Sequence, residues 1–167
     1  MESKVLFNEK QKFTQWWLWL LLIAPIIALF YNLLQPILKN PGFGEGNYSF
    51  TIIPSNDFWI SLFIMFFVIL LFLVLRLSTK ITKETISIRF FPFFTKTWKW
   101  SDITEAHLVT YGFVGYGIRI SGKYGMVYNV KGNKGLAITL KNGRKYLLGT
   151  QKSEQLEQLL QEIKSTN

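Results

Sequence analysis

The stretch Arg89–Trp100, RFFPFFTKTWKW, places six aromatic rings, one proline and three basic side chains in twelve positions. In the overlapping TISIRF (85–90), apolar and polar residues alternate, which is the period of a half-buried β-strand. Pro92 cannot donate a hydrogen bond to a sheet, so FPFF suits a turn or an edge. TKTWKW (95–100) then resumes an extended pattern. The stretch predicts two strands joined by a turn, with many rings facing inward and the charges outward.

Further strands are predicted downstream, separated by Gly-rich turns: 105–111, 116–121, 125–130, 135–140 and 145–150. The strongest local signal is LAITLKNGRKYLLG (136–149). Its Asn142-Gly143 pair predicts a two-residue type I′ hairpin turn. That register sets Ile138 opposite Leu147, with Leu136 on the same side.

The chain closes with a predicted helix. Ser153 is a suitable N-cap, and the apolar residues after it recur at helical spacing: Leu156, Leu159, Leu160 and Ile163. About seven short strands followed by one helix favour a barrel or a pair of packed sheets capped by the helix, because closure or coverage removes exposed strand edges.

Two apolar blocks precede these strands, at 16–34 and 58–75. The first is about 28 Å long as a helix, close to the hydrocarbon thickness of a bilayer. A core helix of a soluble protein keeps a polar stripe, and these blocks have none. A cleaved signal peptide has a shorter apolar run and a small-residue cleavage site, which is absent here. The blocks predict transmembrane helices at 16–38 and 58–76.

Basic residues beside the two spans predict the orientation. They lie before the first span and after the second, with only Lys39 between them: Lys4, Lys10, Lys12, Arg76, Lys80, Lys83 and Arg89. By the positive-inside rule both termini are cytoplasmic. The predicted organisation is therefore an N-terminal cytoplasmic segment (1–15), the two helices with an extracytoplasmic loop (39–57) between them, and a cytoplasmic domain (77–167). Within the loop, SFTII (49–53) is a candidate short strand or interfacial segment, and Asn47 begins an N-glycosylation sequon of a kind that is common by chance.

The domain resembles a pleckstrin-homology-like (PH-like) domain, and more specifically the bacterial PH-domain membrane proteins. The resemblance rests on ISIRFFPF (86–93), WSDITEAHLVTY (100–111), YGIRI (116–120), YNVKGNKGLAITLKNGRKYLLGTQ (128–151) and the final helix. It implies a membrane-anchored α+β protein of a bacterial cytoplasmic (inner) membrane, from families that mostly lack an assigned activity. Phosphoinositide-binding relatives carry a dense basic motif on their first two strands, which Lys80, Lys83 and Arg89 match only loosely.

Little in the sequence indicates chemistry. His107 and Glu105 share a strand face and could interact, yet no nucleophile or second ligand accompanies them. The glycines of YGFVGYG (111–117) lack the order of a dinucleotide-binding loop and suit a turn. The chain has no cysteine. We expect neither an enzyme, nor a metal site, nor a cofactor.

The positive charge is the main functional signal. From Arg76 onward the chain has fifteen Lys and Arg against six Asp and Glu, within a net charge of +9. Six of these residues follow the second span closely and are candidate lipid-facing groups: Arg76, Lys80, Lys83, Arg89, Lys96 and Lys99. The same charges also serve orientation and solubility, and nucleic acid is not an expected partner.

Three functions therefore remain open. The preferred one is a non-catalytic membrane protein whose PH-like domain binds a protein partner or a second copy of itself. The second is binding of anionic lipid head groups. The third is an accessory subunit of a transport complex, in which the polar Asn32 and the helix-bending Pro25 face a partner bundle.

Overall fold

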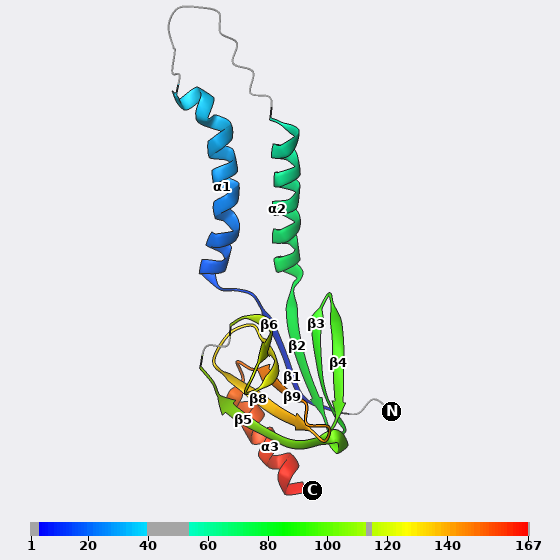
Figure 1. Ribbon diagram of the computed structural model, residues 1–167. Coiled ribbons are helices and arrows are strands. Elements are labelled where there is room, and N and C mark those ends of the chain that lie inside the picture. The colour runs from blue at the N-terminus through cyan, green and yellow to red at the C-terminus, as the bar shows by residue number, and fades with distance from the viewer. Residues whose placement is uncertain (1–3, 40–53, 113–114, 167) are drawn as a thin grey trace, which may run out of the picture. The chain divides into compact units, whose positions relative to one another are not determined.

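The computed structural model describes residues 4–39, 54–112 and 115–166 of the chain. These residues form two compact units, and all of their helices and strands except β7 are labelled in Figure 1. The helical unit (residues 14–73) contains α1 (Trp16–Lys39) and α2 (Asn56–Val74) except for the last residue of α2, Val74. The β unit (residues 1–13 and 74–167) contains the strands and α3 (Ser153–Thr166).

The two predicted long apolar helices are confirmed. Both are long and apolar enough to cross a membrane, and only 6% of each candidate span is buried, unlike the core helix of a soluble protein. α2 begins at Asn56 because the Ser55 hydroxyl caps it, accepting a hydrogen bond from the Phe58 N–H at 3.3 Å. It ends at Val74, since β2 begins at Arg76. Most of the predicted loop, including SFTII and Asn47, lies outside the described residues.

The β unit is built from two sheets. Sheet 1 is antiparallel, in the order β1 (Val5–Lys12), β2 (Arg76–Thr82), β3 (Thr85–Phe91) and β4 (Phe94–Lys99). A 3₁₀ turn (Trp100–Asp102) leads into sheet 2. Sheet 2 has the order β5-β8-β9-β7-β6, with bounds β5 (Ile103–Thr110), β6 (Gly117–Ser121), β7 (Gly125–Asn129), β8 (Lys134–Leu140) and β9 (Lys145–Gly149). Only the pair β7–β9 is parallel among the strand pairs that the structure describes.

The predicted α+β architecture is confirmed at this level. All seven predicted strands are present, and β1 and β2 add two more. The inner face of sheet 1 carries rings of the opening stretch: Phe94 contacts Tyr128 of sheet 2 at 5.9 Å between ring centroids, and Trp98 contacts Tyr146 at 4.9 Å. The fully buried side chains of the core alternate along the strands, as in Leu77, Ile81, Ile86, Ile88, Leu136, Ile138 and Leu148.

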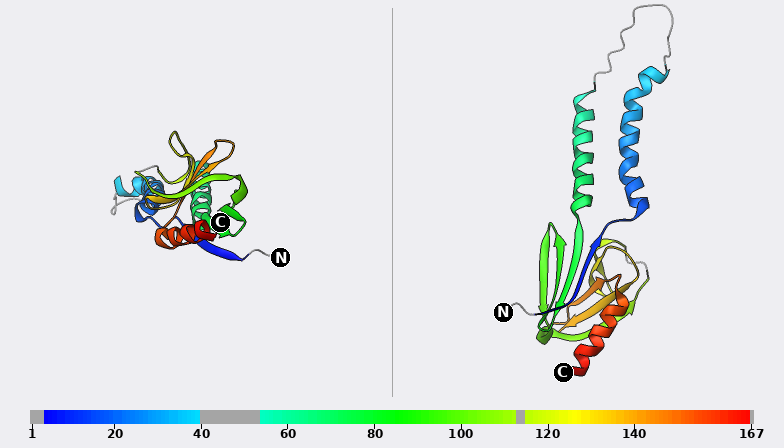
Figure 2. Two further views of the ribbon diagram at one scale, coloured as in Figure 1. Left: turned by 90° about the horizontal axis from the view of Figure 1, so that it is seen from below. Right: turned by 180° about the vertical axis from the view of Figure 1, so that it is seen from behind.

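The predicted C-terminal helix is also confirmed. α3 buries Leu156, Leu159 and Leu160, three of the four apolar residues that predicted it. It packs against β5 and β1, which are edge strands of the two different sheets (Figure 2). Coverage by a helix protects strand edges from pairing with other chains.

The N-terminal strand β1 is the main element that the sequence analysis did not anticipate. Residues 1–15 were set apart from a domain starting at 77, whereas in the structure β1 pairs along its length with β2. Buried polar side chains of β1 also form hydrogen bonds with the rest of the β unit. The buried Glu9 carboxylate accepts hydrogen bonds from the Thr150 hydroxyl (2.6 Å) and the Gln151 N–H (2.8 Å), and Gln11 Nε2 donates to the Gly149 carbonyl (2.7 Å). The β unit therefore comprises chain segments on both sides of the helices.

The predicted register of the β8–β9 hairpin is wrong by one residue. The Gly143 N–H donates to the Leu140 carbonyl, and the Leu140 N–H donates to the Arg144 carbonyl, both at 2.9 Å. This closes a three-residue loop in which Gly143 has φ +79°, as in a type I turn followed by a left-handed residue. Ile138 consequently pairs with Tyr146, and Leu147 pairs with Ala137.

The Tyr111 hydroxyl predicts a pH effect on stability. Tyr111 is buried against Val127 and Leu147, and its hydroxyl has no hydrogen-bond partner within the described residues. Burial raises the pKa of Tyr111 from 10.0 to about 12. The unfolded chain therefore loses this proton first, and the free energy of unfolding should fall between pH 10 and about pH 12.

Replacing this hydroxyl should remove its contribution to the loss of stability at alkaline pH. We expect Tyr111→Phe to keep full stability at neutral pH, because a buried hydroxyl without a partner contributes little. Its stability should then fall less steeply above pH 10 than that of the unsubstituted chain. Denaturant unfolding of the full chain in micelles, repeated from neutral to alkaline pH, measures the stability at neutral pH and its fall above pH 10. Parallel alkaline profiles for the two chains would contradict the expectation.

Candidate functional site

The outward face of sheet 1 is basic. Side chains alternate between the two faces of each strand, so every second residue of β1 to β4 points away from sheet 2. Six of these outward residues are Lys or Arg, here named the basic face: Lys10, Lys12, Arg76, Lys80, Arg89 and Lys99. Their neighbours on the same face are largely Ser, Thr and Asn. The face therefore combines several cations with uncharged hydrogen-bonding groups.

The strand register brings these cations together from distant parts of the chain. Lys12 pairs with Arg76, which pairs with Phe91, and in the next outward row Lys10 lies across from Ser78 and Ser78 from Arg89. Of the acidic residues, the four strands contain Glu9 alone within the described chain, and it points inward. The nearest other carboxylate in sequence, Glu84, lies in the β2–β3 turn. No carboxylate of these strands neutralises the basic face.

The six basic residues that the sequence indicated as lipid-facing do not all lie on the basic face. Four of them, Arg76, Lys80, Arg89 and Lys99, belong to the basic face. Lys83 lies in the β2–β3 turn, at the end of the sheet opposite Arg76.

Lys96 points the other way. Its ammonium lies 5.6 Å from the ring centroids of both Tyr128 and Tyr146 and 5.8 Å from that of Phe94. Because β4 alternates, Lys96 shares the inward side with Phe94 and Trp98, so the prediction that it faces lipid is not supported by its position. Sequence reasoning counted Lys10 and Lys12 only for orientation. Their place beside Arg76 and Arg89 depends on the strand β1, which was not predicted.

Two arginines of the basic face converge on one ring. The Arg76 guanidinium carbon lies 4.6 Å from the centroid of Phe91, and that of Arg89 lies 5.2 Å from it. Each such contact is worth about 0.5–1 kcal/mol at an exposed site. Phe91 thereby holds two guanidinium groups at the end of the sheet where β2 begins and β3 ends.

The predicted intramembrane positions both lie on α1. The helix continues through Pro25 without interruption, and both Pro25 and Asn32 are exposed. Their exposure leaves open what they face in an assembly, so the accessory-subunit function stays a prediction.

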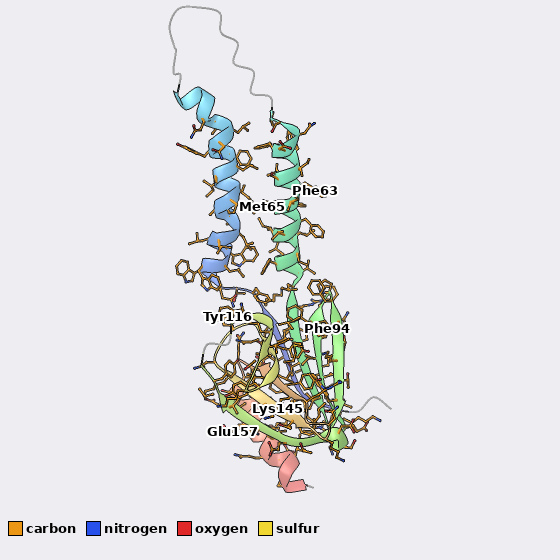
Figure 3. All side chains as sticks on the ribbon, viewed as in Figure 1. Phe63, Met65, Phe94, Tyr116, Lys145 and Glu157 are labelled. Carbon is orange, nitrogen blue, oxygen red and sulfur yellow. The ribbon has the colours of Figure 1, made fainter. Side chains whose placement is uncertain are left out.

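The His107–Glu105 pair lies in a shallow pocket of about 190 Å³ on sheet 2. Its lining also includes Lys123 from the β6–β7 turn, Thr139 from β8 and Lys145 from β9, the last of which is labelled in Figure 3. The described residues show no hydrogen bond between His107 and Glu105 and no group of three or more His, Cys, Asp or Glu that could hold a metal. The pocket brings charges together without giving the histidine the hydrogen bond that orients an acid–base pair.

Known proteins give no further guide to the site. No protein family, curated protein or solved structure matches the chain. The class that the fold and the site define is a two-sheet β unit with a basic outer face, joined to two helices of membrane-spanning length. The resemblance to bacterial PH-domain proteins stays a prediction.

Proposed function

We propose that the chain is a non-catalytic membrane protein whose two helices cross the bilayer and whose β unit docks on anionic lipid head groups through the basic face. The observation that carries the proposal is that β1 to β4 present six cations outward and no carboxylate. Each basic group near an anionic leaflet contributes about 1 kcal/mol, and the contribution decays over a Debye length of about 10 Å at 0.1 M salt. A planar face with several such groups suits a charged planar surface.

The pairing of β1 with β2 supports the helical-hairpin part of the proposal. These strands lie on either side of the two helices in the sequence, yet Lys12 and Arg76 are direct neighbours in sheet 1. The chain before α1 and the chain after α2 must then lie on the same side of any membrane. Two crossings meet this condition and one crossing does not. With the flanking charges, this favours both termini in the cytoplasm.

The links between sheet 1 and the two helices are also short. Three residues separate Lys12 from α1, and Leu75 alone separates α2 from β2. At about 3.6 Å per extended residue, such links keep this end of sheet 1 close to the lipid surface once the helices span. Local tethering raises the effective concentration of the basic face near head groups, so that weak contacts suffice.

Reversing charge on the basic face should abolish this docking. The chain has no cysteine, so Thr97→Cys gives a single labelling site on the same face. In bilayers of phosphatidylcholine with phosphatidylglycerol, energy transfer from a dye at this site to head-group acceptors should exceed that in phosphatidylcholine alone and fall with salt. Lys80→Glu with Arg89→Glu should remove the difference.

The matched control is Lys141→Glu with Arg144→Glu, the same charge change in the exposed β8–β9 loop. We expect this control variant to keep the higher energy transfer in bilayers that contain phosphatidylglycerol. Equal transfer in the two bilayers for the unsubstituted chain would rule out docking by charge.

A protein partner is the second candidate, and β6 is the observation that favours it. β6 is an edge strand of sheet 2, and Ile120 and Ile118 are 83% and 41% exposed. An exposed apolar edge is a template for adding a strand from another chain. Crosslinking from native membranes at Ile120→Cys should recover a reproducible partner or a second copy if this surface is used. Recovery of neither would contradict the use of this surface for a partner.

A further inference from the structure

The turn between β3 and β4 presents an aromatic ring to the outside. The Phe93 N–H donates to the Phe90 carbonyl at 2.8 Å, which closes a tight turn over Pro92. Phe90 is buried, and the Phe93 ring stacks on it at 6.1 Å between centroids with an angle of 18°. Phe93 is nevertheless 59% exposed. The turn thus has an apolar tip whose base is fixed by the core.

This tip lies at the end of sheet 1 that is attached to both helices. Lys12, Arg76 and Phe91 form one row across β1, β2 and β3, and Phe93 follows Phe91 by two residues. Val74, the last residue of α2, is two residues from Arg76, so their Cα atoms are at most about 7–8 Å apart. Covalent continuity therefore restricts the tip to the neighbourhood of the helix ends.

Cations lie at the base of the tip, beside Phe91. Arg76 and Arg89 contact the Phe91 ring at 4.6 and 5.2 Å, and Lys12 occupies the same row. Arg and Lys keep apolar stems against apolar surroundings while their charged ends reach water or phosphate. Phe, like Trp and Leu, is one of the apolar side chains that enter the boundary between head groups and acyl chains in interfacial segments. An exposed apolar ring with cations at its base suits the boundary between acyl chains and head groups, where the ring meets the acyl chains and the cations meet the phosphates.

We infer that the β3–β4 turn inserts into the interfacial layer of the bilayer, with Phe93 as an apolar anchor and Arg76 and Arg89 on lipid phosphates. The occupant is the bilayer that the chain's own helices cross, so the inference rests on the proposed function. It goes beyond charge docking because an apolar anchor holds in uncharged lipid and in salt. The anchor fixes one end of sheet 1 at a defined depth.

Site-specific labels on the full chain in lipid nanodiscs test the anchor. Thr95→Cys, labelled with an environment-sensitive dye, reports on the turn without removing Phe93. Glu84→Cys, in the β2–β3 turn, reports on the opposite end of sheet 1, about 17 Å away along β3 at about 3.4 Å per residue. Phe66→Cys in α2 reports on the span. The readouts are the blue shift of the dye and its quenching by lipid spin-labelled near the head group or deep in the acyl chain.

The inference expects blue shift and shallow quenching at residue 95, in phosphatidylcholine alone and at high salt, and none at residue 84. Phe93→Ser should abolish the effect and Phe93→Trp should retain it, with circular dichroism confirming that both variants fold. Absence of quenching at residue 95 while residue 66 is quenched by the deep label overturns the anchor alone. Absence of quenching at residue 66 overturns the span, and the proposed function with it.

Discussion

A chain that begins at Arg76 is expected not to fold, although it keeps all of the strands after β1 and the helix α3. It lacks β1, which covers the edge of β2 and buries Phe7. It also leaves the Thr150 hydroxyl, the Gln151 N–H and the Gly149 carbonyl without their partners Glu9 and Gln11. Each buried polar group left unpaired costs about 1–3 kcal/mol, and the lost burial of Phe7 adds to this. The total is comparable with the whole stability of a small domain.

Restoring β1 should restore the fold without the helices. Lys12 and Arg76 are paired neighbours, about 5 Å apart between Cα atoms, so a short Gly/Ser linker can join residues 4–13 to residues 75–167. We expect this linked chain to be soluble, with the circular dichroism of a β-rich protein and a cooperative thermal transition. The chain from Arg76 should show neither. Equal thermal midpoints for the two chains would contradict the role assigned to β1.

Glu9 provides a finer control within the linked chain. Glu9→Ala removes both acceptors at once and should cost about 3 kcal/mol, because hydrogen bonds to a charged group are worth about 1.5–3 kcal/mol each. Lys10→Ala, the adjacent outward residue, should change the stability little.

The reason β1 escaped the sequence analysis is physical. VLFNEKQK does alternate, but its inward positions include Glu9 and Gln11, which a binary apolar pattern reads as exposed. Their partners lie about 140 residues away, at Gly149 to Gln151, and no local rule reveals such a pairing. β2 was also not predicted, and its first residue, Arg76, was assigned to the preceding apolar helix. The strands with clean alternation, such as 85–90, were predictable from the sequence.

The basic face, like the strands, could be predicted only in part from the sequence. Alternation alone puts Arg89 outward, and it also puts Lys96 inward once β4 is known to begin at Phe94. Closeness to the end of the second apolar span in the sequence includes Lys96 among the candidate lipid-facing residues and leaves out Lys10 and Lys12. Assembling the face needed the register of three strand pairs, one of which joins segments separated by the helices. Proximity in sequence is a poor guide to a surface that a sheet creates.

Gly125→Ala should be the most damaging conservative change in sheet 2. Gly125 begins β7 with φ +67°, a region that costs a residue with a side chain about 1–2 kcal/mol. A Cβ there would also lie against the backbone carbonyl oxygen of Lys145 in β9. Backbone atoms of a central strand cannot move aside as a flexible side chain can. The parallel pairing of β7 with β9 then has to open, and we expect a loss of about 4 kcal/mol.

Gly143→Ala separates the effect of backbone angle from that of crowding. Gly143 has φ +79°, close to that of Gly125, but nothing lies within 4 Å of a Cβ built on it. Its substitution should therefore cost about 1 kcal/mol, which is the cost of the positive φ angle without any crowding. Denaturant unfolding of the linked chain measures both variants on one scale. Similar losses would mean that the β7–β9 contact yields easily, and that the close approach of Gly125 to Lys145 does not constrain this side of the sheet.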